Sequence, residues 1–75
     1  MINGLMLIKA TAATSSRIVK EAKGTKGVTD AYLVFGRFDI AIFLEAENFP
    51  KLRDLAKKIS SIGGIKSTET LPQGE

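Results

Sequence analysis

The apolar residues of this chain fall into six short blocks that polar or glycine-containing segments separate. Four blocks are compact runs of aliphatic, β-branched and aromatic residues, a pattern typical of strands. The predicted strands span residues 4–10, 28–35, 38–45 and 65–71. The other two blocks carry apolar residues at helical spacing and predict two amphipathic helices.

The ends of both predicted helices carry capping signals. We expect Ser15 or Ser16 to accept a hydrogen bond from the first free N–H groups of the first helix. This helix runs to about residue 23, and Gly24 ends it. Asn48 is the expected N-cap of the second helix, and Gly63-Gly64 is its expected stop.

The element order βαββαβ predicts a ferredoxin-like α+β sandwich, with a four-stranded antiparallel sheet and both helices on one face. Residues 1–75 form one domain, and right-handed crossovers place the first and third strands in the centre.

The strands do not alternate polar and apolar residues, because segments 5–8, 31–35 and 40–44 are apolar on both faces. A second apolar face requires a partner, and a chain of 75 residues has a marginal core. We therefore predict a homodimer that packs sheet against sheet. The alternative is a monomer in which both faces are partly buried.

The composition excludes several classes of function. The chain has no Cys and no His, which excludes disulfide scaffolds, zinc fingers and thiol or imidazole catalysis. The acidic residues show no spacing that identifies a glycosidase or a metal site, so we expect no catalytic residue, metal or cofactor. The apolar runs are far shorter than the ~20 residues of a membrane span, so we expect a cytoplasmic protein without a membrane partner.

A net charge of +3 permits weak contact with nucleic acid but does not require it. The strands lack the aromatic and basic signature of an RNA-binding sheet, and no segment forms a helix-turn-helix, so direct DNA binding is not expected. The basic residues of the predicted helices are interpreted as a solvated surface: Lys20, Lys23, Lys26, Lys51, Arg53, Lys57 and Lys58.

The hairpin between the second and third strands is the first candidate binding feature. Gly36-Arg37 predicts a two-residue type II′ turn. On the simpler interpretation this is only a tight turn with a solvated Arg37 and Asp39. On the functional interpretation, free N–H groups near the turn bind a carboxylate and Asp39 binds an ammonium group. Together they would hold the two charged ends of a free amino acid.

The last predicted strand is the second candidate feature. Alternation places Thr68 and Thr70 on one face and Glu69 on the other. The two threonines are either β-branched residues suited to a strand or paired hydroxyl groups that line a polar pocket.

At these positions the sequence resembles the effector-binding half of the Lrp/AsnC regulators, which is called the RAM domain. The resemblance covers essentially the whole chain and is strongest at four landmarks: Gly27-Val28, the hairpin of residues 35–39, Gly64-Ile65 and Thr68-Glu69-Thr70. It implies a βαββαβ fold that dimerises through its sheet. It also implies that dimers associate into rings of four or five dimers, an octamer or a decamer, with amino-acid effectors bound in clefts between dimers.

The resemblance assigns the expected effector-binding residues to the hairpin and the last strand: Gly36, Arg37, Phe38, Asp39, Thr68 and Thr70. Gly36 and Asp39 match the family's hairpin glycine and aspartate. Arg37 replaces the small or acidic residue common in the family turn, and a cation there would favour an acidic effector or bind the effector carboxylate directly.

The sequence thus resembles a stand-alone RAM domain without the DNA-binding domain of full-length regulators. The leading hypothesis is an amino-acid-binding regulatory module that acts through oligomer assembly and by co-assembly with full-length Lrp/AsnC regulators. The alternatives are a small dimeric ferredoxin-like enzyme and an oligomerisation module without a ligand.

Overall fold

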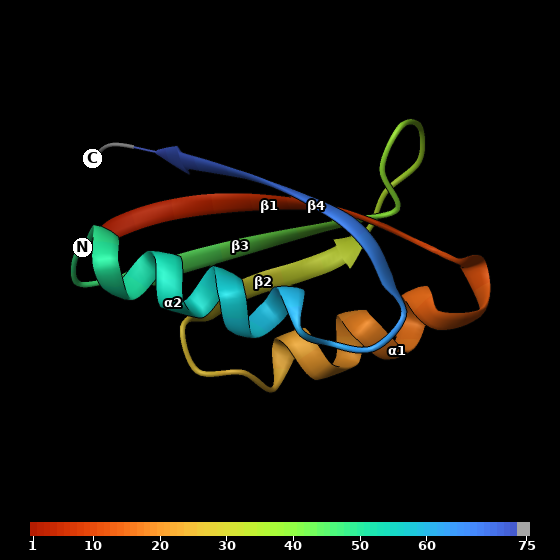
Figure 1. The fold of residues 1–75 in the computed structure, drawn as a ribbon, viewed down its shortest axis with the longest axis horizontal. Coiled ribbons are helices and arrows are strands. Elements are labelled where there is room, and N and C mark those ends of the chain that lie inside the picture. The colour runs from red at the N-terminus through yellow and green to blue at the C-terminus, as the bar shows by residue number, and fades with distance from the viewer. Residues whose placement is uncertain (74–75) are drawn as a thin grey trace.

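The structure, a computed structural model, describes residues 1–73. Its elements follow the predicted order: β1 (Ile2–Ala10), α1 (Ala12–Lys23), β2 (Val28–Leu33), β3 (Ile40–Ala46), α2 (Phe49–Ser60) and β4 (Ile65–Gln73). The strands form one antiparallel sheet in the order β2-β3-β1-β4, and both helices cover the same face (Figure 1). The predicted fold class and the central position of the first and third strands are confirmed.

The core lies between the helices and the central strands. Met6 and Ile8 of β1 are fully buried, as are Ile40 and Ile42 of β3. The helices cover them with a second set of buried side chains: Ile18, Ala22, Leu52, Ala56 and Ile59. Burial of alternate strand residues against helical stripes explains why the apolar periodicity predicts these elements.

The other face of the sheet, which we call the open face, is also apolar. Strand register places these apolar side chains on it: Leu5, Leu7, Tyr32, Ala41, Phe43 and Leu71. Tyr32 and Leu71 are each 43% exposed, and the ring centroids of Tyr32 and Phe43 lie 5.8 Å apart. The non-alternating strands therefore leave an uncovered apolar surface on the single chain.

The first helix begins earlier than predicted. It starts at Ala12, with Thr11 in an extended backbone conformation at the N-cap. The predicted cap by Ser15 or Ser16 is wrong, because Ser15 lies inside the first turn and its hydroxyl donates to the carbonyl oxygen of Thr11 at 2.8 Å. The predicted cap of α2 is confirmed, since the side chain of Asn48 accepts from the backbone N–H of Lys51.

The connection between β2 and β3 is longer than the predicted two-residue turn. β2 ends at Leu33, which pairs with Ile40 at the start of β3. The backbone N–H of Val34 also donates to the carbonyl oxygen of Asp39 at 2.9 Å, so residues 35–38 form the loop. This hairpin loop projects beyond the sheet, away from both helices (Figure 1).

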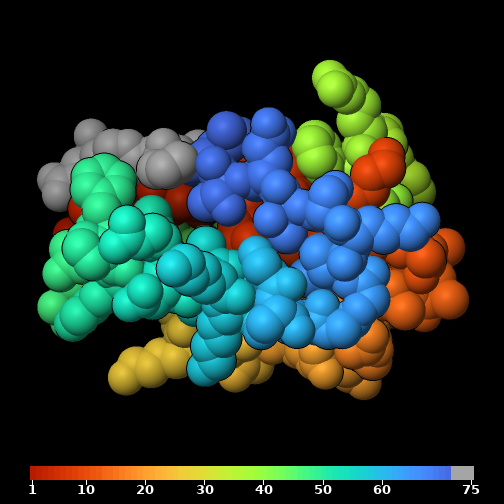
Figure 2. All heavy atoms as spheres, viewed as in Figure 1, coloured from red at the N-terminus to blue at the C-terminus, as the bar shows by residue number. Residues whose placement is uncertain are grey.

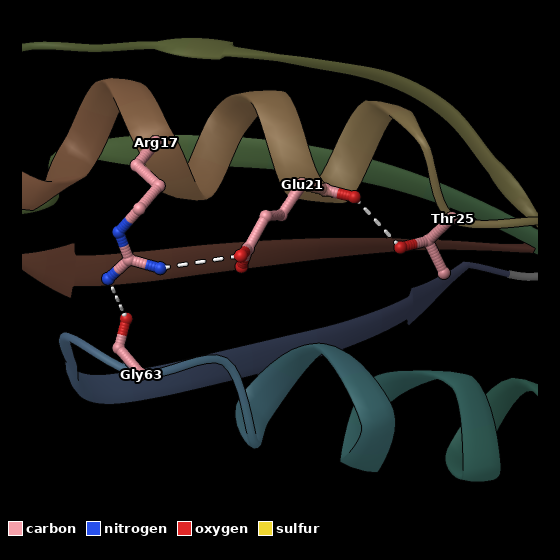
Figure 3. A network of polar contacts seen from close by, with 4 residues as sticks. All are labelled: Arg17, Glu21, Thr25 and Gly63. Carbon is pink, nitrogen blue, oxygen red and sulfur yellow. Dashed lines mark hydrogen bonds and ion pairs between the residues drawn. The ribbon is translucent and has the colours of Figure 1, made fainter.

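A polar network joins α1 to the loop that precedes β4 (Figure 3). Arg17 donates from Nη2 to the carbonyl oxygen of Gly63 at 2.6 Å and from Nη1 to Glu21 at 3.4 Å. Gly64 has a φ of 100°, and a Cβ there would lie 3.0 Å from the Cβ of Thr14. Glycine is therefore required for the close approach of this loop to α1.

Candidate functional site

The tip of the hairpin loop is the most exposed part of the candidate site. Phe35 is 100% exposed, and Gly36 has a φ of 115° with no neighbouring atom near the position of a Cβ. Gly36 is thus selected by backbone conformation and not by crowding. In the space-filling view the loop rises above the surrounding surface (Figure 2). Its tip is free to contact a ligand or another chain.

The base of the hairpin is fastened to the end of β1. Asp39 is half-buried, and its N–H donates to the carbonyl oxygen of Ile8 at 2.8 Å. Its carboxylate oxygen Oδ2 accepts from the backbone N–H of Ala10 at 2.9 Å. A charge-assisted bond of this kind fixes the carboxylate in place. Asp39 therefore has a structural role that the sequence did not reveal, and its Oδ1 has no hydrogen-bond donor among residues 1–73.

Two cationic residues, Lys9 and Arg37, belong to the same region of the hairpin, and neither forms an ion pair with Asp39 in the described part of the chain. Lys9 donates from Nζ to the carbonyl oxygen of Arg37 at 3.1 Å, which places its ammonium group at the hairpin. The guanidinium of Arg37 is exposed and forms no ion pair within the part of the chain that the structure describes. The hairpin base thus combines one fixed carboxylate with two cationic side chains, an arrangement that suits a ligand carrying both charges.

Phe38 directly precedes Asp39 at the end of the loop. Its side chain is half-buried, whereas Phe35 at the other end of the loop is fully exposed. Phe38 therefore contributes partly exposed apolar surface at the hairpin.

The two threonines face the helices. In the strand register Thr68 pairs with Ile8 and Thr70 pairs with Met6, and both partners are core residues. The hydroxyl of Thr68 lies 3.5 Å from the hydroxyl of Ser60 in α2. Thr70 lines a groove between α2 and β4.

The structure brings together only part of the predicted site. Asp39 bonds to Ile8 on one side of β1, and Thr68 pairs with Ile8 on the other side. The two therefore lie about 10 Å apart, which is two interstrand spacings. Thr70 is two residues further along β4, and the hairpin loop between β2 and β3 projects in the other direction (Figure 1). Within one chain the hairpin tip and Thr70 do not share a pocket.

Lys9 and Ala10 are contributors that the sequence interpretation missed. Lys9 is the only charged residue in the strand that runs from residue 2 to residue 10. A single charged residue in an otherwise apolar strand could have indicated that Lys9 belongs to the site. The bond from Ala10 uses a backbone N–H, which no side-chain pattern can reveal.

Neither a metal centre nor a spanning helix is found in the described residues. Among residues 1–73, no group of three or more acidic, His or Cys side chains is placed to hold a metal ion. No helix within those residues is long and apolar enough to cross a membrane.

Comparison with known families decides the family of the chain. The model of the Lrp/AsnC ligand binding domain matches residues 4–72. The chain belongs to the Lrp/AsnC ligand-binding domain family. This family consists of regulatory ligand-binding domains of transcription regulators and not of enzymes. Comparison with curated protein sequences gives no significant match.

Solved structures agree with this assignment. AsnC of E. coli is 27% identical with a TM-score of 0.85, and the match covers 96% of this chain and 50% of AsnC. TTHA0845 from Thermus thermophilus is 24% identical with a TM-score of 0.93, and the match covers 100% of this chain and 95% of that one. PHS023 from Pyrococcus horikoshii is 22% identical with a TM-score of 0.89, covering 97% of this chain and 89% of that one. The last two matches show the shared fold.

Proposed function

We propose that this Lrp/AsnC ligand-binding domain binds a free amino acid at the hairpin and responds through its oligomeric assembly. The observation that carries the proposal is the charge arrangement at the hairpin base. One half-buried carboxylate, Asp39, lies with two cations, Lys9 and Arg37, around an exposed loop. A zwitterionic ligand satisfies both signs of charge at once, whereas a simple cation or anion satisfies only one.

Each residue has a distinct role in this proposal. Arg37 and the N–H groups of the loop bind the effector carboxylate, and Asp39 binds the effector ammonium group through Oδ1 while Oδ2 remains bonded to Ala10. Phe38 contributes apolar surface that selects among effector side chains. Gly36 permits the backbone conformation that exposes the loop N–H groups.

Thr68 and Thr70 bind the effector from a second copy of the chain. Both are too far from the loop tip to reach the same ligand within one chain, because they face α2 while the loop projects away from the helices. A site shared between neighbouring copies links effector binding to assembly, since a ligand that binds only the assembled form stabilises that form.

The open face is the proposed dimer interface. Leu5, Leu7 and Phe43 of the central strands form a continuous apolar surface there, and burial against a second sheet would remove it from water. We propose that such dimers associate further into an octamer or a decamer. Co-assembly with full-length Lrp/AsnC regulators would carry the effector signal to DNA, which this domain is not expected to bind directly.

An NMR titration tests the proposal. We would record ¹⁵N–¹H spectra of the assembled protein with each of the twenty amino acids in turn. We expect one or a few of them to shift the resonances of residues 36–39 together with those of Thr68 and Thr70. Shifts at the hairpin without the threonines would contradict a site shared between copies. No shift with any amino acid would favour an oligomerisation module that binds no effector.

A further inference from the structure

A groove of about 720 Å³ lies between α2 and β4, on the helical side of the sheet and apart from the hairpin. Its volume falls within the range of about 300–1,000 Å³ that is usual for small-molecule sites. Figure 2 shows α2 (cyan) and β4 (blue) side by side, with β1 (red) visible between them. No residue of the hairpin lines this groove.

The groove exists because β4 is an edge strand with small side chains. α2 directs Leu52 and Ala56 into the core over the central strands. Thr70, a helix-facing residue of β4 that lines the groove, is too small to fill the space beside the helix. Phe49 lies at the start of α2, is 55% exposed and forms an apolar wall at one end.

Two cations line the same groove without a counter-charge. Arg53 and Lys57 are four residues apart on α2, and neither side chain has an ion pair or hydrogen bond among residues 1–73. By contrast, Lys51 on the same helix is paired with Glu47 at 3.2 Å. Like charges at this spacing destabilise a helix, so an anion bound between them is favoured. The sequence interpretation treats Arg53 and Lys57 as part of a solvated surface. Their position in the groove indicates instead that they are available to bind an anion.

We propose that the groove binds an amphiphilic organic carboxylate, with its carboxylate at Arg53 and Lys57 and its apolar body along α2 toward Phe49. The axial distance from Lys57 to Phe49 is about 12 Å at the helical rise of 1.5 Å per residue. A medium-chain fatty acid or an arylalkanoic acid has the required length and polarity. The apolar lining favours such a ligand over inorganic phosphate, which would leave the exposed side chain of Phe49 without a contact.

The test is a titration of the folded protein with octanoate, kept below its micelle-forming concentration and followed by ¹⁵N–¹H NMR. We expect saturable shifts of residues 49–61 and of Thr70. Acetate lacks the apolar body and 1-octanol lacks the charge, so each should bind more weakly than octanoate.

Adjacent lysines provide a matched pair of variants. Lys57→Gln removes a charge inside the groove, and Lys58→Gln removes the same charge from a residue that does not line it. We expect Lys57→Gln to weaken octanoate binding about 2- to 5-fold, the range for a partly exposed ion pair, and Lys58→Gln to leave it unchanged. An equal effect of both variants would show that only net charge matters and would overturn the proposal.

Two further outcomes would also overturn it. Octanoate shifts confined to Leu5, Leu7 and Phe43 would indicate adsorption on the open face. Loss of octanoate binding in Arg37→Gln would place the ligand at the hairpin, because Arg37 is the proposed carboxylate partner there, whereas unchanged binding separates this groove from the proposed amino-acid site. The groove proposal therefore stands or fails independently of the proposed effector.

Discussion

Asp39 is expected to have two separable roles, one in stability and one in ligand binding. Its Oδ2 accepts from the N–H of Ala10 at 2.9 Å, and Ala10 is only 7% exposed. Replacing Asp39 by Ala leaves that N–H without its partner. The loss of a hydrogen bond to a charged group, with the donor left buried, costs about 2 kcal/mol.

This loss in the free energy of unfolding corresponds to a measurable decrease of the melting temperature. For a domain of this size 1 kcal/mol corresponds to about 4–8 °C, so Asp39→Ala should lower Tm by about 10 °C. Asp39→Asn retains an amide oxygen that can accept from Ala10, and it should lower the free energy of unfolding by no more than about 1 kcal/mol. Both variants lose the negative charge and should lose amino-acid binding.

The assays are thermal denaturation, which gives Tm, and urea denaturation, which gives the free energy of unfolding. Both use one fixed protein concentration, because the stability of an oligomer depends on concentration. Asp54→Ala is a suitable control, since Asp54 is an exposed carboxylate on α2 and its loss should change stability by no more than about 0.5 kcal/mol. If Asp39→Ala unfolds at the same urea concentration as the unchanged protein, the bond to Ala10 contributes nothing. The structural role of Asp39 would then be refuted.

Three further predictions concern the α2 cap, a glycine and the open face. Asn48→Ala should destabilise the fold by about 1 kcal/mol in urea denaturation, because the N–H of Lys51 loses its acceptor; an unchanged midpoint would contradict the cap. Gly64→Ala should lower the free energy of unfolding more than Gly36→Ala in the same assay. Both glycines have positive φ, but only Gly64 has neighbours within 3.4 Å of an added Cβ. Equal losses would show that crowding at Gly64 is unimportant. Phe43→Lys should yield a folded monomer by sedimentation velocity and circular dichroism, and a persisting dimer would exclude the open face as the interface.

The fold could be predicted because its elements follow from local apolar periodicity. The apolar stripe at helical spacing predicts the buried face of the second helix: Leu52, Leu55, Ala56, Ile59 and Ile62. Leu52, Ala56 and Ile59 are buried, whereas Leu55 and Ile62 are partly buried against the core. The cap at Asn48 needs only a contact three residues away, which sequence spacing reveals directly. The predicted start of α1 is too late because Ala12 and Ala13 are small and exposed, so no stripe of buried apolar residues marks the first turn.

The site could be predicted only in part because its geometry depends on contacts between distant segments. The loop is longer than a two-residue turn because Val34 bonds to Asp39 and Asp39 bonds to Ile8 and Ala10. The bond to Ala10 joins residues 29 positions apart and uses a backbone donor. The orientation of Thr70 toward α2 likewise follows from the pairing of β4 with β1, two strands at opposite ends of the chain that no turn joins.

The most direct test of the central claim measures thermal stability and mass in solution together, with and without each of the twenty amino acids. A ligand at 100 times its dissociation constant stabilises the state it binds by about 2.7 kcal/mol. We predict that one or a few amino acids raise Tm and change the sedimenting mass, and that Asp39→Asn abolishes both effects. If no amino acid changes Tm or mass, the hairpin is only a turn and the effector-sensing account is contradicted.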